Sequence, residues 1–174
     1  ISLDSGTVRW GFRLTGAVFG GVIRADSSVY VASVRPEGNV LALRATNGHK
    51  RWSVKVGAAS APLALVHGLL LVPTRQGRLV ALSPVSGMMF WQRTVGYARS
   101  PAIAAGPGIA IATLDSMFLL GADGRVLRRR SAPGAMIAAW HEAGPLLVGA
   151  TADSVVVAVH AADLSTAWST RLDA

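Results

Sequence analysis

The side chains able to do chemistry are few and scattered. The chain has no cysteine, which excludes disulfides, thiolate metal ligands and a cysteine nucleophile. Its histidines fall in predicted turns of different repeats, at no metal-ligand spacing: His49, His67, His141 and His160. His141 and Glu142 beside Trp140 form the one local cluster, where Trp140 is interpreted as structural. No Ser-His-Asp set or carboxylate pair emerges. The sequence therefore predicts no catalytic, cofactor-binding or metal-binding residues.

The basic residues follow a pattern. Fifteen Arg and two Lys stand against nine acids, for a net charge of +8. Eleven lie in or beside the last predicted strand of a repeat: Arg9, Arg13, Lys50, Arg51, Lys55, Arg93, Arg125, Arg128, Arg129, Arg130 and Arg171. On an outer strand such charges prevent pairing with other chains. The alternative is a basic surface for an acidic partner or anionic lipid, densest at Arg125, Arg128, Arg129 and Arg130.

A recurring unit of Gly, three residues and Trp organises the chain. It is intact at Gly6 to Trp10, Gly48 to Trp52 and Gly87 to Trp91, and degraded at Gly124 to Arg128 and Leu164 to Trp168. The unit starts lie 42, 39, 37 and 40 residues apart, which indicates a repeat architecture. We interpret four Trp and four Gly as blade-docking residues: Trp10, Trp52, Trp91, Trp168, Gly6, Gly48, Gly87 and Gly124. Where Arg128 replaces Trp, we expect the weakest packing and the first place for a binding surface.

Each period contains four short apolar segments separated by Gly, Pro and Asn turns, with no helical periodicity. Four antiparallel strands per about 40 residues are typical of a β-propeller blade. We predict an all-β chain, 1–174, forming a single propeller segment. Its units are 1–14 (partial), 15–56, 57–95, 96–132 and 133–174. The partial unit is expected to supply one leading strand at 8–14, and the last unit an innermost strand at 136–140.

Two segments carry a family resemblance. Ala42-Leu43-Arg44-Ala45-Thr46-Asn47-Gly48 followed by Trp52, and Ala81-Leu82-Ser83-Pro84-Val85-Ser86-Gly87 followed by Trp91, resemble the PQQ-like (quinoprotein-type) propeller repeat. Arg44 and Ser83 replace the usual Asp of that signature. The resemblance implies rings of about seven or eight blades. The four complete blades here are therefore expected to belong to a larger ring, whose other blades lie in the same parent chain or in a second copy. The remaining alternative is a strained closure of the four blades on themselves.

The resemblance implies two classes of function. Quinone dehydrogenases hold PQQ and Ca²⁺ through Glu, Asn and Asp and add a disulfide, whereas this chain has two Glu, two Asn and no Cys. We therefore expect no cofactor and no enzyme. The other class resembles the cell-envelope lipoprotein of the outer-membrane β-barrel assembly machinery, a non-catalytic scaffold for protein–protein interaction.

The expected location is accordingly periplasmic or otherwise extracytoplasmic. The expected partners are proteins, with contact to an anionic membrane surface as a further option. Nucleic acid is not expected, because aromatic residues are only 6% and no recognition motif is present. The alternatives are a segment of a quinoprotein dehydrogenase and the sensor domain of a membrane-bound kinase or regulator.

Overall fold

The computed structural model describes residues 5–14, 16–34, 38–134 and 140–172. These residues form four antiparallel sheets of four strands each, and they contain no helix. Each sheet is built from four strands that follow one another along the chain and pair in that same order.

The strands run as follows. The first blade has β1 (Val18–Ala25), β2 (Ser28–Ser33), β3 (Asn39–Arg44) and β4 (Lys50–Lys55). The second has β5 (Ala64–Val66), β6 (Leu69–Pro73), β7 (Arg78–Leu82) and β8 (Met89–Thr94). The third has β9 (Ile103–Ala105), β10 (Gly108–Ala112), β11 (Ser116–Leu120) and β12 (Val126–Ser131). The fourth has β13 (His141–Ala143), β14 (Leu146–Ala150), β15 (Val155–His160) and β16 (Thr166–Arg171).

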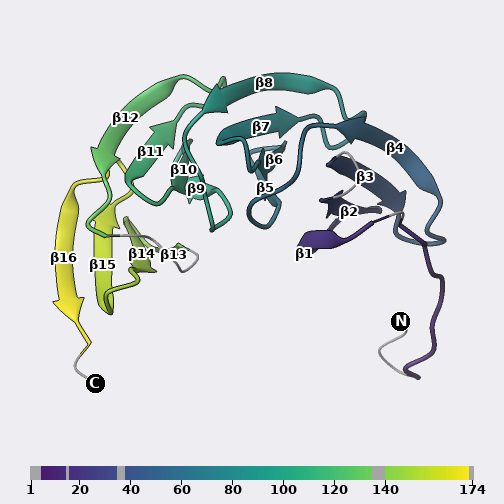
Figure 1. The fold of residues 1–174 in the computed structure, drawn as a ribbon, viewed down its shortest axis with the longest axis horizontal. Helices are drawn as coiled ribbons and strands as arrows, with labels where there is room; N and C mark the ends of the chain where they lie inside the picture. The colour runs from purple at the N-terminus through teal and green to yellow at the C-terminus, as the bar shows by residue number, and fades with distance from the viewer. Residues whose placement is uncertain (1–4, 15, 35–37, 135–139, 173–174) are drawn as a thin grey trace.

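The four blades stand side by side along an open arc (Figure 1). Strands β4, β8, β12 and β16 form the outer rim, while β1, β5, β9 and β13 face the concave side. This arrangement confirms the prediction of an all-β, partial propeller. No helix capable of crossing a membrane occurs among the described residues.

The burial of the strands explains their sequences. All five residues of β10 and of β11 are buried, because both faces of the third blade are covered by its neighbours. In β14 buried and half-buried residues alternate, as expected for a sheet with one covered face. The outer strands β12 and β16 are exposed throughout, which suits their charged and polar residues.

Three apolar cores fill the spaces between blades. Successive residues of a strand point to opposite faces, so Leu70 packs with Val40 toward the first blade while Leu71 packs with Ile109 toward the third. The third core joins Leu119 to Leu147 and Val157 of the fourth blade. Burial of a Leu side chain contributes about 1.5–3 kcal/mol, so these cores fix how the blades stand against one another.

A β-bulge recurs between the third and fourth strands of every blade. The register shifts after Ala42, Ala81, Leu119 and Ala158. These four residues pair with Trp52, Trp91, Arg128 and Trp168 respectively. A bulge strengthens the local twist and re-aims the adjacent side chain. It therefore sits where the repeat must direct a Trp toward the next blade.

Two expectations differ from the structure. Residues 8–14 form no strand, because no described strand pairs with them and an unpaired segment lacks the hydrogen bonds of a ladder. In the fourth blade, the innermost strand expected at 136–140 falls largely outside the described residues. Described strand structure there covers His141–Ala143, where we expected the start of a turn.

Candidate interaction surface

Neighbouring blades are joined by a Trp of an outer strand that lies on the Gly turn of the next blade. The indole Nε1 of Trp52 donates a hydrogen bond to the carbonyl oxygen of Pro84, at 3.1 Å. Gly87 has a φ of 75°, and a Cβ added to it would lie 2.7 Å from Cε3 of Trp52. Glycine is therefore required here both by its backbone conformation and by the ring above it.

The same joint forms twice more. Trp91 Nε1 donates to the carbonyl of Ala122 at 2.8 Å, and Trp10 Nε1 donates to that of Ala45 at 2.9 Å. A Cβ on Gly124 or Gly48 would collide with the ring of Trp91 or Trp10. Thus the segment 5–14, although not a strand, docks its Trp on the first blade as a preceding blade would.

Two of the predicted docking residues are not brought into a joint. Gly6 has the expected positive φ of 65°, but a Cβ placed on it would have no atom within 4 Å. Trp168 lies on β16 with 45% of its surface exposed. Their docking role therefore stays a prediction.

The joint between the third and fourth blades is built differently, and we call it the Leu164 joint. Arg128 occupies the Trp position and is exposed, whereas Leu164 occupies the Gly position and is buried. Leu164 keeps the left-handed backbone, with φ 62°. It packs with the buried Trp140 around a small cavity of about 10 Å³. The sequence placed Trp140 in a structural role, and the structure puts it in this core, while His141 and Glu142 are exposed.

All four predicted surface arginines are exposed, with Arg125 in the turn before β12 and the other three on that strand. Arg129 lies over the ring of Phe118, 5.4 Å from its centroid, and donates from Nη2 to Ser116 Oγ at 3.2 Å. Arg130 Nε donates to the carbonyl of Asp163 in the next blade, at 3.1 Å. Arg128 Nη1 donates to the carbonyl of its own neighbour Leu127, at 3.0 Å. Arg129 and Arg130 thus contact other strands or turns of the chain, although both are exposed.

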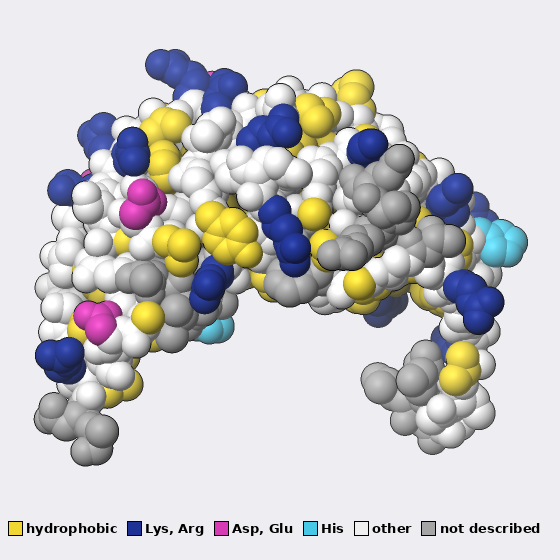
Figure 2. Space-filling view, viewed as in Figure 1, with side chains coloured by type: hydrophobic (Ala, Val, Ile, Leu, Met, Phe, Trp, Pro, Cys, Tyr) yellow, Lys and Arg dark blue, Asp and Glu magenta, His cyan; other side chains and the backbone are white. Residues whose placement is uncertain are grey.

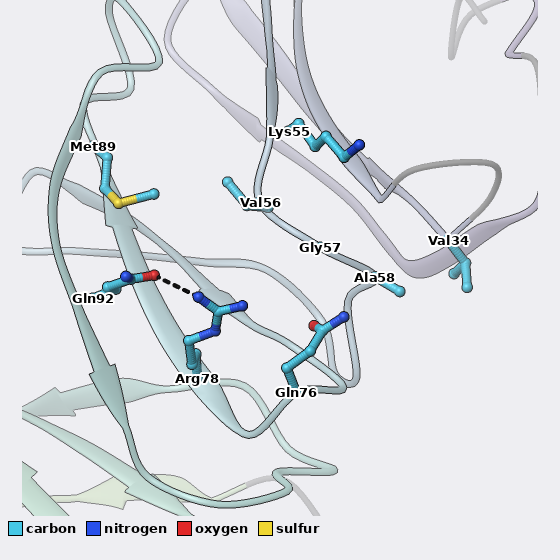
Figure 3. A pocket seen from close by; sticks show the side chains of 9 residues that line it. All are labelled: Val34, Lys55, Val56, Gly57, Ala58, Gln76, Arg78, Met89 and Gln92. Atoms are coloured by element: carbon cyan, nitrogen blue, oxygen red, sulfur yellow. Dashed lines mark hydrogen bonds between the residues drawn. The ribbon is translucent and has the colours of Figure 1, made fainter.

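A groove lies between the first and second blades (Figure 3). Its volume is about 440 Å³. Lys55 of β4, Arg78 of β7, Gln92 of β8 and Gln76 of the turn before β7 supply its polar wall, with Val56 and Met89 among its apolar residues. Arg78 Nη1 donates to Gln92 Oε1 at 3.2 Å. No acidic residue is among the described residues that line this blade 1–2 groove.

An equivalent groove lies one blade earlier. It has a volume of about 230 Å³, and its polar residues include Arg13, Lys50, Asn39 and Ser53. Asn39 begins the ladder of β3 with β4 as Arg78 begins that of β7 with β8, so the two residues hold matching positions. The described lining again contains two cations and no acid. The repeat therefore presents a basic groove at two successive joints.

The stretch of sequence that supplies most of the blade 1–2 groove contains no acidic residue. Residues 38–114 contain no Asp or Glu but eight basic residues: Arg44, Lys50, Arg51, Lys55, Arg75, Arg78, Arg93 and Arg99. Elsewhere in the chain nine basic residues balance nine acids. In the view of Figure 2, the visible acidic side chains lie over the half that holds the third and fourth blades. The net charge of +8 therefore belongs to the acid-free segment.

The described residues do not fit the quinone and Ca²⁺ site of a dehydrogenase. Among them no three His, Asp or Glu side chains come together in a way that would hold a metal ion. Ca²⁺ requires six to eight oxygen ligands, mostly from carboxylates and carbonyls. We therefore derive no catalytic step for these residues.

Sequence reasoning named Lys55 as an outer-strand residue but missed Arg78, Gln76 and Gln92. No periodic motif marks them, because they come from two strands and a turn. The absence of acids over residues 38–114 is the signal that would have directed attention to this region.

Comparison with known proteins agrees with the repeat. Residues 1–106 match the family model described as outer membrane protein assembly factor BamB. A search of curated proteins found no match. BamB from Moraxella catarrhalis superimposes with a TM-score of 0.67 at 18% identity, covering 95% of this chain and 65% of that one. This chain thus spans just under two thirds of that BamB.

Other solved structures share the fold at still lower identity. A europium-containing methanol dehydrogenase gives a TM-score of 0.76 at 12% identity, covering 90% of this chain and 42% of that one. The computationally designed protein Ika4 gives 0.75 at 10% identity, covering 89% of this chain and 98% of its own. These likenesses establish the propeller fold alone. Because the family model spans more than half of the sequence, the chain belongs to the PQQ-like propeller family described as outer membrane protein assembly factor BamB.

Proposed function

We propose that this chain is part of a non-catalytic propeller that acts in the cell envelope as a scaffold for protein–protein interaction in outer membrane protein assembly. The observation that carries the proposal is the match of residues 1–106 to the BamB family model. Supporting it, the joints and apolar cores between blades hold them in a fixed arrangement that suits a scaffold.

A propeller of this family can also serve an enzyme, since one fold hosts many activities. The methanol dehydrogenase has a propeller of similar shape, and its likeness at 12% identity supports shared fold only. The two functions differ in an observable way, because the family resemblance implies a bound quinone for a quinone dehydrogenase and none for the scaffold.

The test uses the parent protein, epitope-tagged and expressed in its own organism. We expect it to fractionate with the cell envelope and, after cross-linking, to co-purify with components that assemble outer-membrane β-barrels. An unrelated tagged periplasmic protein serves as the control. Recovery in the cytoplasm, or a stoichiometric quinone extracted from the purified protein, would overturn the proposal.

A further inference from the structure

The blade 1–2 groove combines the features of a site for a carboxylate. Arg78 is half-buried, and its Nη1 is oriented by Gln92 Oε1. A guanidinium has five N–H donors in a rigid plane, so Arg78 can bind a carboxylate while keeping this bond. Gln76 extends its amide beside Gly57, whose added Cβ would lie 2.7 Å from Gln76 Oε1. The side chains of Arg78, Gln76 and Gln92 lie close to one another along one wall (Figure 3).

The surroundings favour a negative ligand over a longer range. All of the described lining residues except Val34 come from residues 38–114, a stretch that carries eight cations and no Asp or Glu. The equivalent groove beside it also contains two cations, Arg13 and Lys50. Clefts lined by one sign of charge concentrate the field and attract ligands of the opposite sign.

One exposed apolar side chain lines the groove beside its polar wall. Met89 of β8 is 41% exposed and lies among the lining residues. An unbranched Met side chain adapts to partners of varied shape, so it offers an apolar contact next to the polar groups.

We propose that the blade 1–2 groove binds an acidic peptide segment of a partner protein. A Glu or Asp carboxylate of the segment lies against Arg78 and Gln76, and an adjacent apolar side chain packs on Met89. This assignment rests on the proposed function, because it gives the scaffold a partner of defined chemistry.

A peptide fits this site better than a membrane or a nucleic acid. The groove is recessed between two blades and has a volume of about 440 Å³, within the range of about 300–1,000 Å³ typical of ligand pockets. A flat headgroup layer does not reach into such a recess. The described lining contains no aromatic ring on which a base would stack.

The test measures binding of a labelled synthetic peptide that alternates Glu and Leu, by fluorescence anisotropy with the purified 174-residue chain. We expect saturable binding that weakens with added salt. A peptide with Gln in place of Glu is expected to bind at least about tenfold more weakly, because the Arg78 guanidinium then loses its charged acceptor.

Two variants locate the site. Arg78→Gln is expected to weaken binding of the Glu peptide by about tenfold. The matched control is Arg99→Gln, which removes the same charge from an exposed loop position of the same segment and is expected to leave binding within about twofold. Gln92→Glu places a carboxylate next to Arg78 and keeps the fold's hydrogen bond, so it is expected to reduce binding as much as Arg78→Gln does.

The following binding results overturn the inference. Equal losses in Arg78→Gln and Arg99→Gln indicate diffuse attraction rather than a site, and equal binding of the Gln peptide excludes carboxylate recognition. Arg78-dependent binding of phosphatidylglycerol vesicles without binding of the peptide assigns the groove to lipid. Far-ultraviolet circular dichroism verifies that the variants fold. Peptide binding that does not depend on Arg78 overturns the assignment of the groove but not the scaffold role. If the peptide binds as expected but no envelope partner is recovered, only the scaffold role is overturned.

Discussion

The Trp52–Gly87 joint and the Leu164 joint occupy equivalent places in the fold but are filled by opposite choices of side-chain size. In the first, the ring of Trp52 from one blade lies on Gly87 of the next blade. Trp52 is paired across the ladder of β3 and β4 with Ala42. In the Leu164 joint the Trp position holds Arg128, the Gly position holds Leu164 and the Ala position holds Leu119.

Three positions therefore differ together. The outer strand β12 has no Trp ring at this position. Instead, Leu164 on the turn and the buried Trp140 fill the core between the third and fourth blades. Because protein interiors are close-packed, loss of a large residue at one position requires filling from another. The repeat thus specifies the total volume of a joint, and the contributing residue varies.

Removal of the Trp52 ring is expected to have the largest effect on stability. Trp52→Ala is expected to lower the free energy of unfolding by about 3 kcal/mol, since it deletes a large side chain and the hydrogen bond to Pro84. Arg128→Ala, at the equivalent place in the Leu164 joint, is expected to cost less than about 0.5 kcal/mol because Arg128 is exposed. Urea unfolding followed by circular dichroism measures both. Similar costs for the two would show that the joints do not differ in this way.

The next largest effect concerns the glycine. Gly87→Ala is expected to cost about 2 kcal/mol, from the left-handed backbone and from a Cβ placed 2.7 Å from Trp52. Gly68→Ala is the control, because Gly68 has almost the same φ, 74°, and a Cβ there meets nothing within 4 Å. The control isolates the backbone term of about 1 kcal/mol. Equal losses in the two variants would mean that the ring moves aside without cost.

A smaller effect is expected when the Leu164 joint is given the Trp and Gly residues of the Trp52–Gly87 joint. Arg128→Trp and Leu164→Gly are each expected to destabilise the chain, since the first meets Leu164 and the second leaves a cavity beside Trp140. Combined, they should recover about 1 kcal/mol relative to the sum of the single changes. A double-mutant cycle in urea measures this coupling. Strict additivity would show that Trp and Gly do not depend on one another.

The smallest effect is a pH dependence at the turn of the Leu164 joint. Hydrogen bonds from the Ser165 side chain and backbone, with a lesser contribution from the charge of Arg130, hold the pKa of Asp163 below its usual value. A lowered folded-state pKa stabilises the fold above the unfolded value near 3.8, and this stabilisation is lost as the pH falls through the folded pKa.

Asp163→Asn should therefore lower the unfolding midpoint slightly at neutral pH, and its difference from the unmodified chain should shrink as the pH drops below about 3.8. Thermal unfolding across that range measures the difference. A difference that stays constant with pH would assign the effect to the shape of the turn rather than to the charge of Asp163.

The parts of each blade could be predicted from the local sequence. The spacing of Gly and Trp predicted the period, and the apolar segments between turn residues predicted four antiparallel strands in each repeat, as the four sheets have. The basic residues of the fourth strands lie on the outer rim as expected. These features are local, because turn chemistry and side-chain alternation are written in neighbouring residues.

The contacts between blades could not be predicted in this way, because they join residues that are distant in the sequence. Arg129 turns onto Phe118 while Arg130 reaches Asp163, because alternate residues of a strand point to opposite faces. Leu164 can occupy the Gly position because Arg128, at the Trp position, is exposed and places no ring over that turn. The blade 1–2 groove joins Lys55 of one blade to Arg78 of the next. Such contacts depend on the packing angle between sheets, which no local pattern encodes.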